Sequence, residues 1–275
     1  MPCLSEEESE RRTMNLNRKL EKMCGQIVHE DNSVISLGEQ AIVLRNKGDL
    51  KGALKLNKKA EKICRKLVHT DPLAIHNLAI SICNQAHILR DQGNLDGALK
   101  LHKKREKIYR ELGDLKGLQN TLYDQALILR TQGDNDGALK LHLEQEKICR
   151  KIGNSDGLQL SLGRQAHILK DRGDLDGALK LHKEKEKICR EFGLDESLAT
   201  ALANQASIIF NTGHPAEAFF LAKEASEIAD RVGSVSVAGQ VKGIISEINR
   251  YNEKEDVIRN ISDILQKADI FKTEE

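Results

Sequence analysis

The sequence predicts an all-α chain folded as an α-solenoid, in which antiparallel helix pairs stack along one axis. The strongest observation is an internal repeat, because the dipeptide Gln-Ala recurs at Gln40, Gln85, Gln125, Gln165 and Gln205. The interval is 45 residues once and 40 residues thereafter. Hydrophobic residues make up 39% of the chain, charged residues 31% and aromatic residues 3%, which suits amphipathic helices better than one large globular core. Only three prolines occur, so little interrupts a helix.

Each repeat carries the same turn signal. A glycine follows every Gln-Ala pair, and an alanine lies five residues beyond each glycine. The glycines are Gly48, Gly93, Gly133, Gly173 and Gly213, and the alanines are Ala53, Ala98, Ala138, Ala178 and Ala218. Segments 85–113 and 165–193 are identical at 22 of 29 positions. Duplication of one structural unit explains this pattern.

Every repeat is interpreted as two helices, illustrated by residues 158–172 and 176–191. The first carries Leu162, Ala166 and Leu169 at spacings of four and three, which indicates one apolar helical face. Gly173 and Gly193 follow the two helices, where a turn with positive φ favours glycine. Asp114, Asn154 and Asp195 follow helix ends and are expected to cap or turn into the next helix. Two short helices cannot bury their apolar faces alone, so neighbouring repeats must share a core.

The chain is expected to have three parts. Residues 1–32 form a tail and a lone opening helix, because Met14–Val28 matches Leu56–Val68 at an interval of 40 residues. Five repeats follow, at about 33–72, 73–113, 114–153, 154–193 and 194–233. Residues 234–275 form a partial repeat, with a first helix at Val235–Arg250 and a polar closing helix at Glu255–Phe271. The five extra residues of the first interval are placed in a longer loop around Pro72.

The small residue, the Gly-Asp-Leu turn and the alanine that follows it resemble the tetratricopeptide repeat family. Its pattern is carried by Leu162, Ala166, Leu169, Gly173-Asp174-Leu175 and Ala178, and by their equivalents in each repeat. The 40-residue length resembles the subclass of LGN and kinesin light chain type arrays, which also includes the sensor arms of some signalling NTPases. The resemblance implies a right-handed superhelix. Gln165, His182 and Lys185 depart from the family pattern, which usually has Leu, an aromatic residue and Ala there.

The resemblance also implies that a ligand lies in the concave groove lined by the first helices. One column of groove positions holds Arg45, Arg90, Arg130 and Lys170, with Phe210 breaking it. Such a stripe is suited to an acidic peptide segment of a partner protein. The alternative interpretation is a set of solvated helix ends, where Lys and Arg favour the negative end of the helix dipole. Asp91 and Asp171 would partly cancel the charge.

A second groove column holds Glu39, Asn84, Asp124, Arg164 and Asn204. Peptide-binding members of the family often have Asn there, and the resemblance carries a backbone-clamping role only to Asn84 and Asn204. The alternative is a row of exposed polar residues. Specificity is expected at groove residues that differ between repeats. The candidate partner-binding set therefore also includes His87, Tyr123, His167 and Phe210.

The other recurring polar residues are interpreted as structural. His102, His142 and His182 recur every 40 residues, but equivalent residues of adjacent repeats lie about 10 Å apart, too far to share one metal ion. Cys24, Cys64, Cys149 and Cys189 share one position and are expected to be buried thiols. The repeated glutamine is either a buried amide bonded to an inter-repeat backbone group or a half-exposed packing residue. The recurrent Glu-Lys pairs are placed on a solvated convex face.

Several function classes find no support in the sequence. The formal net charge is +1, which does not favour nucleic acid, and no apolar stretch is long enough for a membrane span. No apolar leader opens the chain, so cytoplasmic localisation is expected. No catalytic or cofactor motif occurs, and neither a cofactor nor a small-molecule substrate is expected.

The leading hypothesis is a non-enzymatic adaptor that binds a peptide or helix of another protein in the groove. One alternative is a regulatory or sensor arm, or a fragment, of a larger signalling NTPase-type protein. Another is a spacer that stacks end to end, although the polar segment 251–275 argues against open-ended stacking.

Overall fold

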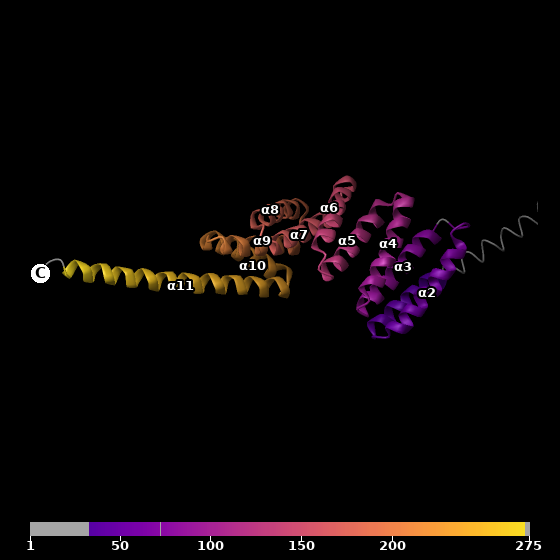
Figure 1. The fold of residues 1–275 in the computed structure, drawn as a ribbon, viewed down its shortest axis with the longest axis horizontal. Coiled ribbons are helices and arrows are strands. Elements are labelled where there is room, and N and C mark those ends of the chain that lie inside the picture. Colours follow the sequence, from indigo (N-terminus) through magenta and orange to yellow (C-terminus); the bar gives the residue numbers. More distant parts are fainter. Residues whose placement is uncertain (1–32, 72, 273–275) are drawn as a thin grey trace, which may run out of the picture. The chain divides into compact units, whose positions relative to one another are not determined.

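The protein is helical throughout, apart from short connections, over the residues that its structure describes. This structure is a computed structural model, which describes residues 33–71 and 73–272, with side chains as far as residue 255. No strand occurs within these ranges (Figure 1). The predicted all-α fold is therefore confirmed. The opening helix predicted at Met14–Val28 and the residue Pro72 lie outside the described residues.

The helices alternate between first and second members of a pair. The first helices span residues 33–46, α3 (Ala74–Asp91), α5 (Leu115–Thr131), α7 (Ser155–Asp171) and α9 (Asp195–Asn211). The second helices are α2 (Leu50–Leu67), α4 (Leu95–Leu112), α6 (Asn135–Ile152), α8 (Leu175–Phe192) and α10 (Pro215–Val232), and α11 (Val235–Lys272) follows. The chain divides into two compact units, the N-terminal unit, Met1–Asp134, and the C-terminal unit, Asn135–Glu275.

Side-chain caps and glycines define the ends of most helices. Asp114 and Asn154 cap α5 and α7 as predicted, each accepting a hydrogen bond from the backbone N–H three residues on. The prediction for Asp195 is wrong, because it is the first residue of α9 and Leu194 takes the cap position without a side-chain bond. Leu194 directly follows Gly193, where the preceding repeats have Asp or Asn. Asp195 instead forms an ion pair with Arg231 at 3.1 Å.

The turn glycines have the positive φ that the sequence predicts. Gly173 has φ +83° after α7, and Gly193 has φ +66° after α8. The N–H of Gly173 donates to the carbonyl of Lys170 and the next N–H donates to the carbonyl of Leu169, both at 2.9 Å. These bonds satisfy carbonyls that the end of a helix leaves open. The chain can therefore reverse within two or three residues between most helices.

The core is built from small clusters that join neighbouring repeats. In the N-terminal unit, Ala86 and Ala98 of one helix pair pack with Ile128 of the next first helix. In the C-terminal unit, Ala166 and Ala178 pack with Ile208 in the same way. All four alanines are fully buried. An isolated pair would leave these faces open to water, so the shared core predicted from the sequence is confirmed.

The recurrent glutamine has a partner that the sequence did not identify. Its amide donates to a glutamate carboxylate of the preceding second helix at 2.6–2.7 Å, in the pairs Gln85–Glu61, Gln125–Glu106, Gln165–Glu146 and Gln205–Glu186. These glutamines are at most 3% exposed. Of the two alternatives for the amide, a backbone bond is present at Gln205, as a second contact to the carbonyl of His182 at 3.4 Å.

The expected convex position of the Glu-Lys pairs is wrong for their glutamates. The side chains of Glu61, Glu106, Glu146 and Glu186 are only 18–21% exposed. Each carboxylate also pairs with the arginine four residues on, as Glu146 does with Arg150 at 2.9 Å. The glutamates turn inward because the buried amide of the next repeat needs an acceptor.

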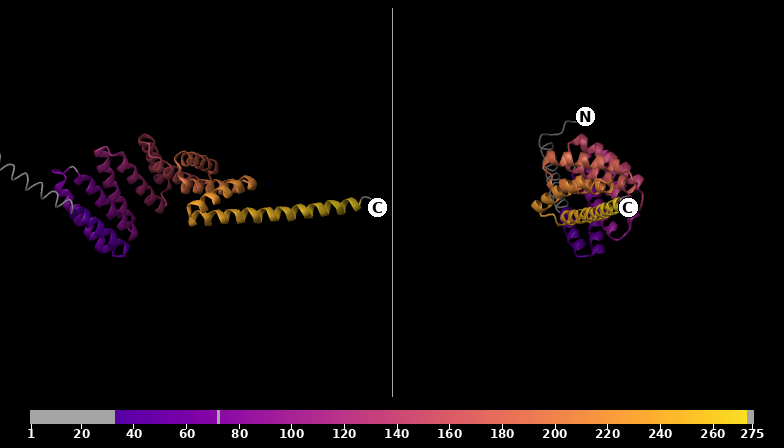
Figure 2. Two further views of the ribbon diagram at one scale, coloured as in Figure 1. Left: turned by 180° about the vertical axis from the view of Figure 1, so that it is seen from behind. Right: turned by 90° about the vertical axis from the view of Figure 1, so that its left-hand side faces the viewer.

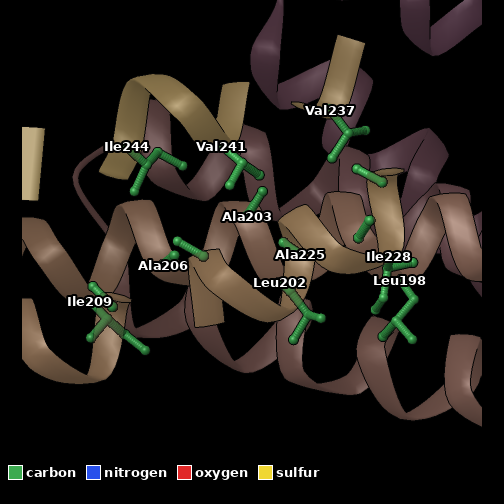
Figure 3. Packing of buried hydrophobic residues seen from close by; sticks show 14 of the residues in the cluster. Leu198, Leu202, Ala203, Ala206, Ile209, Ala225, Ile228, Val237, Val241 and Ile244 are labelled. Atoms are coloured by element: carbon green, nitrogen blue, oxygen red, sulfur yellow. The ribbon is translucent and has the colours of Figure 1, made fainter. Parts of the chain in front are cut away.

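The C-terminal segment differs from its prediction. A break between a first helix and a separate closing helix was expected near residues 251–254, but α11 is one continuous helix (Figure 2). Residues 251–254 contain neither glycine nor proline, so nothing at the expected break ends a helix. The inward face expected for the closing helix lies outside the side chains that the structure describes. The first part of α11 is firmly packed, since Val237, Val241 and Ile244 are buried in one cluster with α9 and α10 (Figure 3).

The structure also tests the predicted burial of the cysteines. Cys64, Cys149 and Cys189 are buried thiols, as expected, and burial raises the pKa of Cys149 and Cys189 to about 11. Cys24 lies outside the described residues.

The connection from α2 to α3 runs from residue 68 to 73 and is longer than the other connections, as the sequence predicts. Among the described residues, no helix is long and apolar enough to cross a membrane.

The turn conformation can be tested with two glycine substitutions of opposite expected sign. Gly173→Ala should reduce the free energy of unfolding by about 1–2 kcal/mol, because a Cβ disfavours the left-handed region. A Cβ at this site would meet no atom within 4 Å, so the cost comes from the backbone. Gly243→Ala, in an exposed and equally open position of α11, should stabilise by about 0.5–1 kcal/mol. Urea unfolding followed by circular dichroism measures the free energy of unfolding of both variants. A change of the same sign in both would contradict the left-handed conformation of Gly173.

Candidate partner-binding groove

The first helices line clefts in both units. In the N-terminal unit, a mostly apolar cleft of about 220 Å³ lies against residues 33–46 and α3, beside Ile35, Ile80 and Asn84. In the C-terminal unit, a cleft of about 340 Å³ is lined by Gly163, Arg164, His167 and Lys185, together with residues of α9 and α11. Both clefts are formed by predicted groove residues and their neighbours, but their chemistry differs.

A single glycine shapes the cleft of the C-terminal unit. Gly163 occupies the position held by Cys83, Tyr123 and Ala203 in other repeats. A Cβ at Gly163 would lie 3.4 Å from Nζ of Lys185. The missing side chain therefore makes room for the lysine, which reaches from α8 toward the first helix.

This cleft carries an excess of positive charge. Lys185 is 6% exposed, and among the described residues it forms no ion pair. Burial, and then the charge of Arg164, lower the pKa of Lys185. One acidic side chain, Glu196, also lines the cleft, and it accepts a hydrogen bond from Ser234 at 2.8 Å. A buried ammonium without a carboxylate partner is costly, so the site favours an anion from outside the chain.

The two asparagines assigned a clamping role make contacts within the chain. The amide nitrogen of Asn204 lies 3.4 Å from Nε2 of His167, and its oxygen accepts a hydrogen bond from Gln240 at 3.1 Å. The amide nitrogen of Asn84 donates to Asn57 at 3.3 Å. A peptide backbone would have to replace or share these bonds. The clamping role of both residues stays a prediction.

The basic column is partly neutralised by neighbouring residues. Arg45 pairs with Asp91 at 2.6 Å, and Arg90 lies 3.6 Å from the same carboxylate, so the cancellation expected from Asp91 occurs. Lys170 donates to the hydroxyl of Ser207 at 3.2 Å, a neutral partner that leaves its charge in place. Arg130 is half-buried on α5. The position where Phe210 breaks the column is filled by an edge-to-face contact with Tyr251, with 6.0 Å between ring centroids.

Asp124 is the centre of a polar cluster in the N-terminal unit, next to the half-buried Tyr123. Its Oδ2 accepts a hydrogen bond from Nη1 of Arg105 at 2.9 Å, and its Oδ1 lies 3.7 Å from Nε2 of His87. The neighbouring carboxylate of Asp124 raises the pKa of His87 to about 9, whereas burial lowers the pKa of His102 to about 4. The structure thus brings His87 and Asp124 together from the predicted set.

Two important residues, Lys185 and Arg105, were missing from the predicted set. Both lie on second helices, at the position that holds Gln145 in another repeat. A signal was present, since Lys185 stands where the tetratricopeptide pattern has alanine. Only the structure shows that both side chains reach across to a first helix.

Comparison with known proteins places the fold. No family model matches the sequence, and no curated protein matches it either. Among solved structures, a signal transduction ATPase with numerous domains from Pyrococcus horikoshii, which has a tetratricopeptide repeat sensor, aligns with a TM-score of 0.67 at 18% identity. The alignment covers 78% of this chain and 32% of that one, so this chain spans about a third of its length.

Two further structures show the same likeness. A putative kinesin light chain from Podosopora anserina with nearly identical tetratricopeptide-like repeats aligns with a TM-score of 0.59 at 17% identity, covering 73% of this chain and 97% of that one. A Rap protein in complex with competence and sporulation factor aligns with a TM-score of 0.59 at 13% identity, covering 86% and 68%. The chain is a tetratricopeptide-like helical array. At these identities the likeness concerns the fold.

The histidine beneath the basic cleft generates a pH prediction. His182 is fully buried, neither ring nitrogen has a hydrogen-bond partner, and its ring centroid lies 5.7 Å from that of His167. Burial, and then the charges of His167, Lys185 and Lys170, lower its pKa to about 3. An unfolded chain would protonate His182 below about pH 6.5. Its contribution to stability is therefore complete above that pH and is lost as the pH falls toward 3.

The variant His182→Phe should remove this loss. Its stability advantage over the wild type should grow by at most about 1.4 kcal/mol for each pH unit below 6.5, measured by urea unfolding between pH 7 and pH 4. His69→Gln, at an exposed position, is the control and should keep the wild-type slope. Parallel acid slopes for His182→Phe and the wild type would contradict the prediction.

Proposed function

We propose that this protein is a non-enzymatic interaction scaffold of the adaptor type, acting in the cytoplasm, which holds an acidic segment of a partner protein against its first helices. The basic cleft of the C-terminal unit carries this proposal. Arg164 and Lys185 line one cleft of about 340 Å³, and Lys185 is 6% exposed without an ion pair among the described residues. A glutamate or aspartate side chain of the partner would supply the missing anion.

The energetic argument rests on the local dielectric environment. A hydrogen bond between charged groups contributes about 1.5–3 kcal/mol, roughly twice a neutral one. The interaction is stronger away from bulk water, and the ammonium of Lys185 has already been desolvated on folding. Burial lowers the pKa of Lys185, so a bound carboxylate would also restore the stability of its charged form. Exposed lysines elsewhere would gain far less from an ion pair.

Two of the structural relatives support a binding role. The Rap protein was solved in complex with competence and sporulation factor, so a protein that contains this fold binds another molecule. The signal transduction ATPase has a tetratricopeptide repeat sensor, which supports the second candidate, a sensor arm of a larger signalling protein. The gene neighbourhood separates the two, since a nucleotide-binding module encoded in the same reading frame would favour the sensor arm.

The acidic specificity can be measured with matched probes. Three fluorescent peptides of equal length and apolar content, carrying Glu, Gln or Lys at the same positions, are titrated at low salt and followed by anisotropy. The Glu peptide should bind most tightly and the Lys peptide least. The double variant Arg164→Gln plus Lys185→Met should weaken binding of the Glu peptide by more than about 100-fold, because two charge-assisted contacts are lost.

A control with the same change in net charge tests location. Lys183 and Lys187 are exposed on α8, outside the cleft, so Lys183→Met plus Lys187→Gln should alter affinity by less than about threefold. If both double variants lost the same affinity for the Glu peptide, binding would be due to general electrostatic attraction and not to the cleft. Equal affinity of the three peptides for the wild type would exclude the acidic segment.

A further inference from the structure

The N-terminal unit contains a cluster of metal-ligating side chains that the proposed peptide site does not use. Cys83 and His87 lie one turn apart on α3, His102 lies on α4 and Asp124 on α5. Ligand atoms of Cys83, His102 and Asp124 all lie within 4.8 Å of one another. Nε2 of His87 lies 3.8 Å from Sγ of Cys83 and 3.7 Å from Oδ1 of Asp124. Three helices thus bring four potential ligands of three residue types close together.

The distances match a tetrahedral ion after a small adjustment. Zinc binds thiolate at about 2.3 Å and imidazole or carboxylate at about 2.0–2.2 Å, so ligand atoms of one tetrahedral ion lie about 3.3–3.8 Å apart. The contacts of His87 already fall within this range. The ligand atoms of Cys83, His102 and Asp124 lie within 4.8 Å of one another, so these side chains need to approach by up to about an ångström.

A second, independent feature points to a ligand at this place. His102 is 1% exposed, and its Nδ1 has no hydrogen-bond partner. Burying a ring nitrogen without a partner is unfavourable, whereas a cation between His102 and Asp124 would occupy its lone pair. His182 also lacks partners, but it is surrounded by Lys185 and His167, which would repel a cation.

Within the part of the chain that the structure describes, thiol, imidazole and carboxylate ligands come together only in this cluster. Other repeats replace Cys83 by Tyr123, Gly163 or Ala203. They replace Asp124 by Asn84, Arg164 or Asn204. The scaffold therefore does not require a thiol or a carboxylate at these positions. Comparison of equivalent histidines could not find this site, because its ligands occupy four different repeat positions.

The surrounding charges are compatible with a dication. The thiolate of Cys83 and the carboxylate of Asp124 together balance two positive charges. Nη1 of Arg105 donates to Oδ2 of Asp124 at 2.9 Å, which leaves Oδ1 for the ion and holds the carboxylate in place. Such outer hydrogen bonds orient metal ligands. Arg90 is the other cation that acts on His102, and its side chain is directed to Asp91 at 3.6 Å.

We propose that Cys83, His87, His102 and Asp124 form a tetrahedral zinc site that joins α3, α4 and α5. The ion takes the place of protons: the Cys83 thiol and the His87 imidazolium each release one proton to solvent, and two ligand bonds form there. All four coordination positions are held by protein atoms, which is the arrangement of a structural site rather than a catalytic one.

Cobalt and zinc binding to the full chain test the site. The protein, prepared without an affinity tag and stripped with a chelator, is titrated with Co²⁺. One equivalent should produce thiolate-to-cobalt charge-transfer absorption and the intense visible bands of tetrahedral cobalt, and Zn²⁺ should displace it. Zn²⁺ should also raise the thermal unfolding midpoint. Absence of the charge-transfer band, or binding without a change in the midpoint, would overturn the proposal.

Variants locate the ion. Cys83→Ser should abolish the charge-transfer band, and Asp124→Asn should weaken Zn²⁺ binding by more than about tenfold. Asn occupies the position of Asp124 in two other repeats, so this variant is expected to fold, and circular dichroism checks that it does. Cys83→His should keep zinc while losing the charge-transfer band. Cys149→Ala, at a buried cysteine of another repeat, is the control; loss of the band there, or its survival in Cys83→Ser, would contradict the assigned ligands.

Discussion

The contact between two alanines of a helix pair and an isoleucine of the next pair is the constraint on which this structure depends. Ala166 and Ala178 let two helices approach closely, but their small side chains cannot cover each other, and Ile208 of the following helix completes the cluster. Each pair is therefore stable only with a neighbour. Any larger side chain at these alanines would separate the helices and lose dispersion contacts along both faces. The repeats share this packing, so their scaffold positions are nearly identical and the variation among them lies in the groove.

The glutamine–glutamate bond adds direction to that packing. An apolar contact tolerates sliding, whereas a hydrogen bond of 2.6 Å between Gln165 and Glu146 fixes where one helix lies along the next. The same carboxylate binds Arg150, which also reaches Glu184 at 2.6 Å. A buried amide alone would be a cost, but a fully paired chain of polar groups specifies the register of successive repeats.

Much of the fold could be predicted from the sequence because its determinants are local and repeated. A glycine equivalent to Gly173 marks the turn in every copy, and Asn154 marks the start of a helix. The features that were not predicted depend on residues distant in the sequence or on the absence of a helix terminator. The glutamate partner of the glutamine lies 19 residues away on another helix in most copies, and repetition alone does not reveal which polar groups meet. The continuity of α11 follows from the absence of a terminator, which the partial repeat pattern obscured. The groove residues were predicted by column, but Lys185 joins them from a second helix.

The side chains at a few groove positions decide the chemistry of each unit. The histidine pairs are arranged alike in both, since His87–His102 and His167–His182 each have 5.7 Å between ring centroids, with interplanar angles of 53° and 58°. In the N-terminal unit, Cys83 and Asp124 lie beside the histidines and make the cluster suitable for a cation. In the C-terminal unit, Asn204 takes the place of Asp124, Gly163 that of Cys83 and Arg164 that of Asn84, so the cluster suits an anion. Three substitutions on first helices therefore reverse the sign of the local charge, while the second helix keeps a cation, Arg105 or Lys185, in both units. A repeat scaffold whose core is fixed by alanines can acquire different ligands in this way at no cost to its packing.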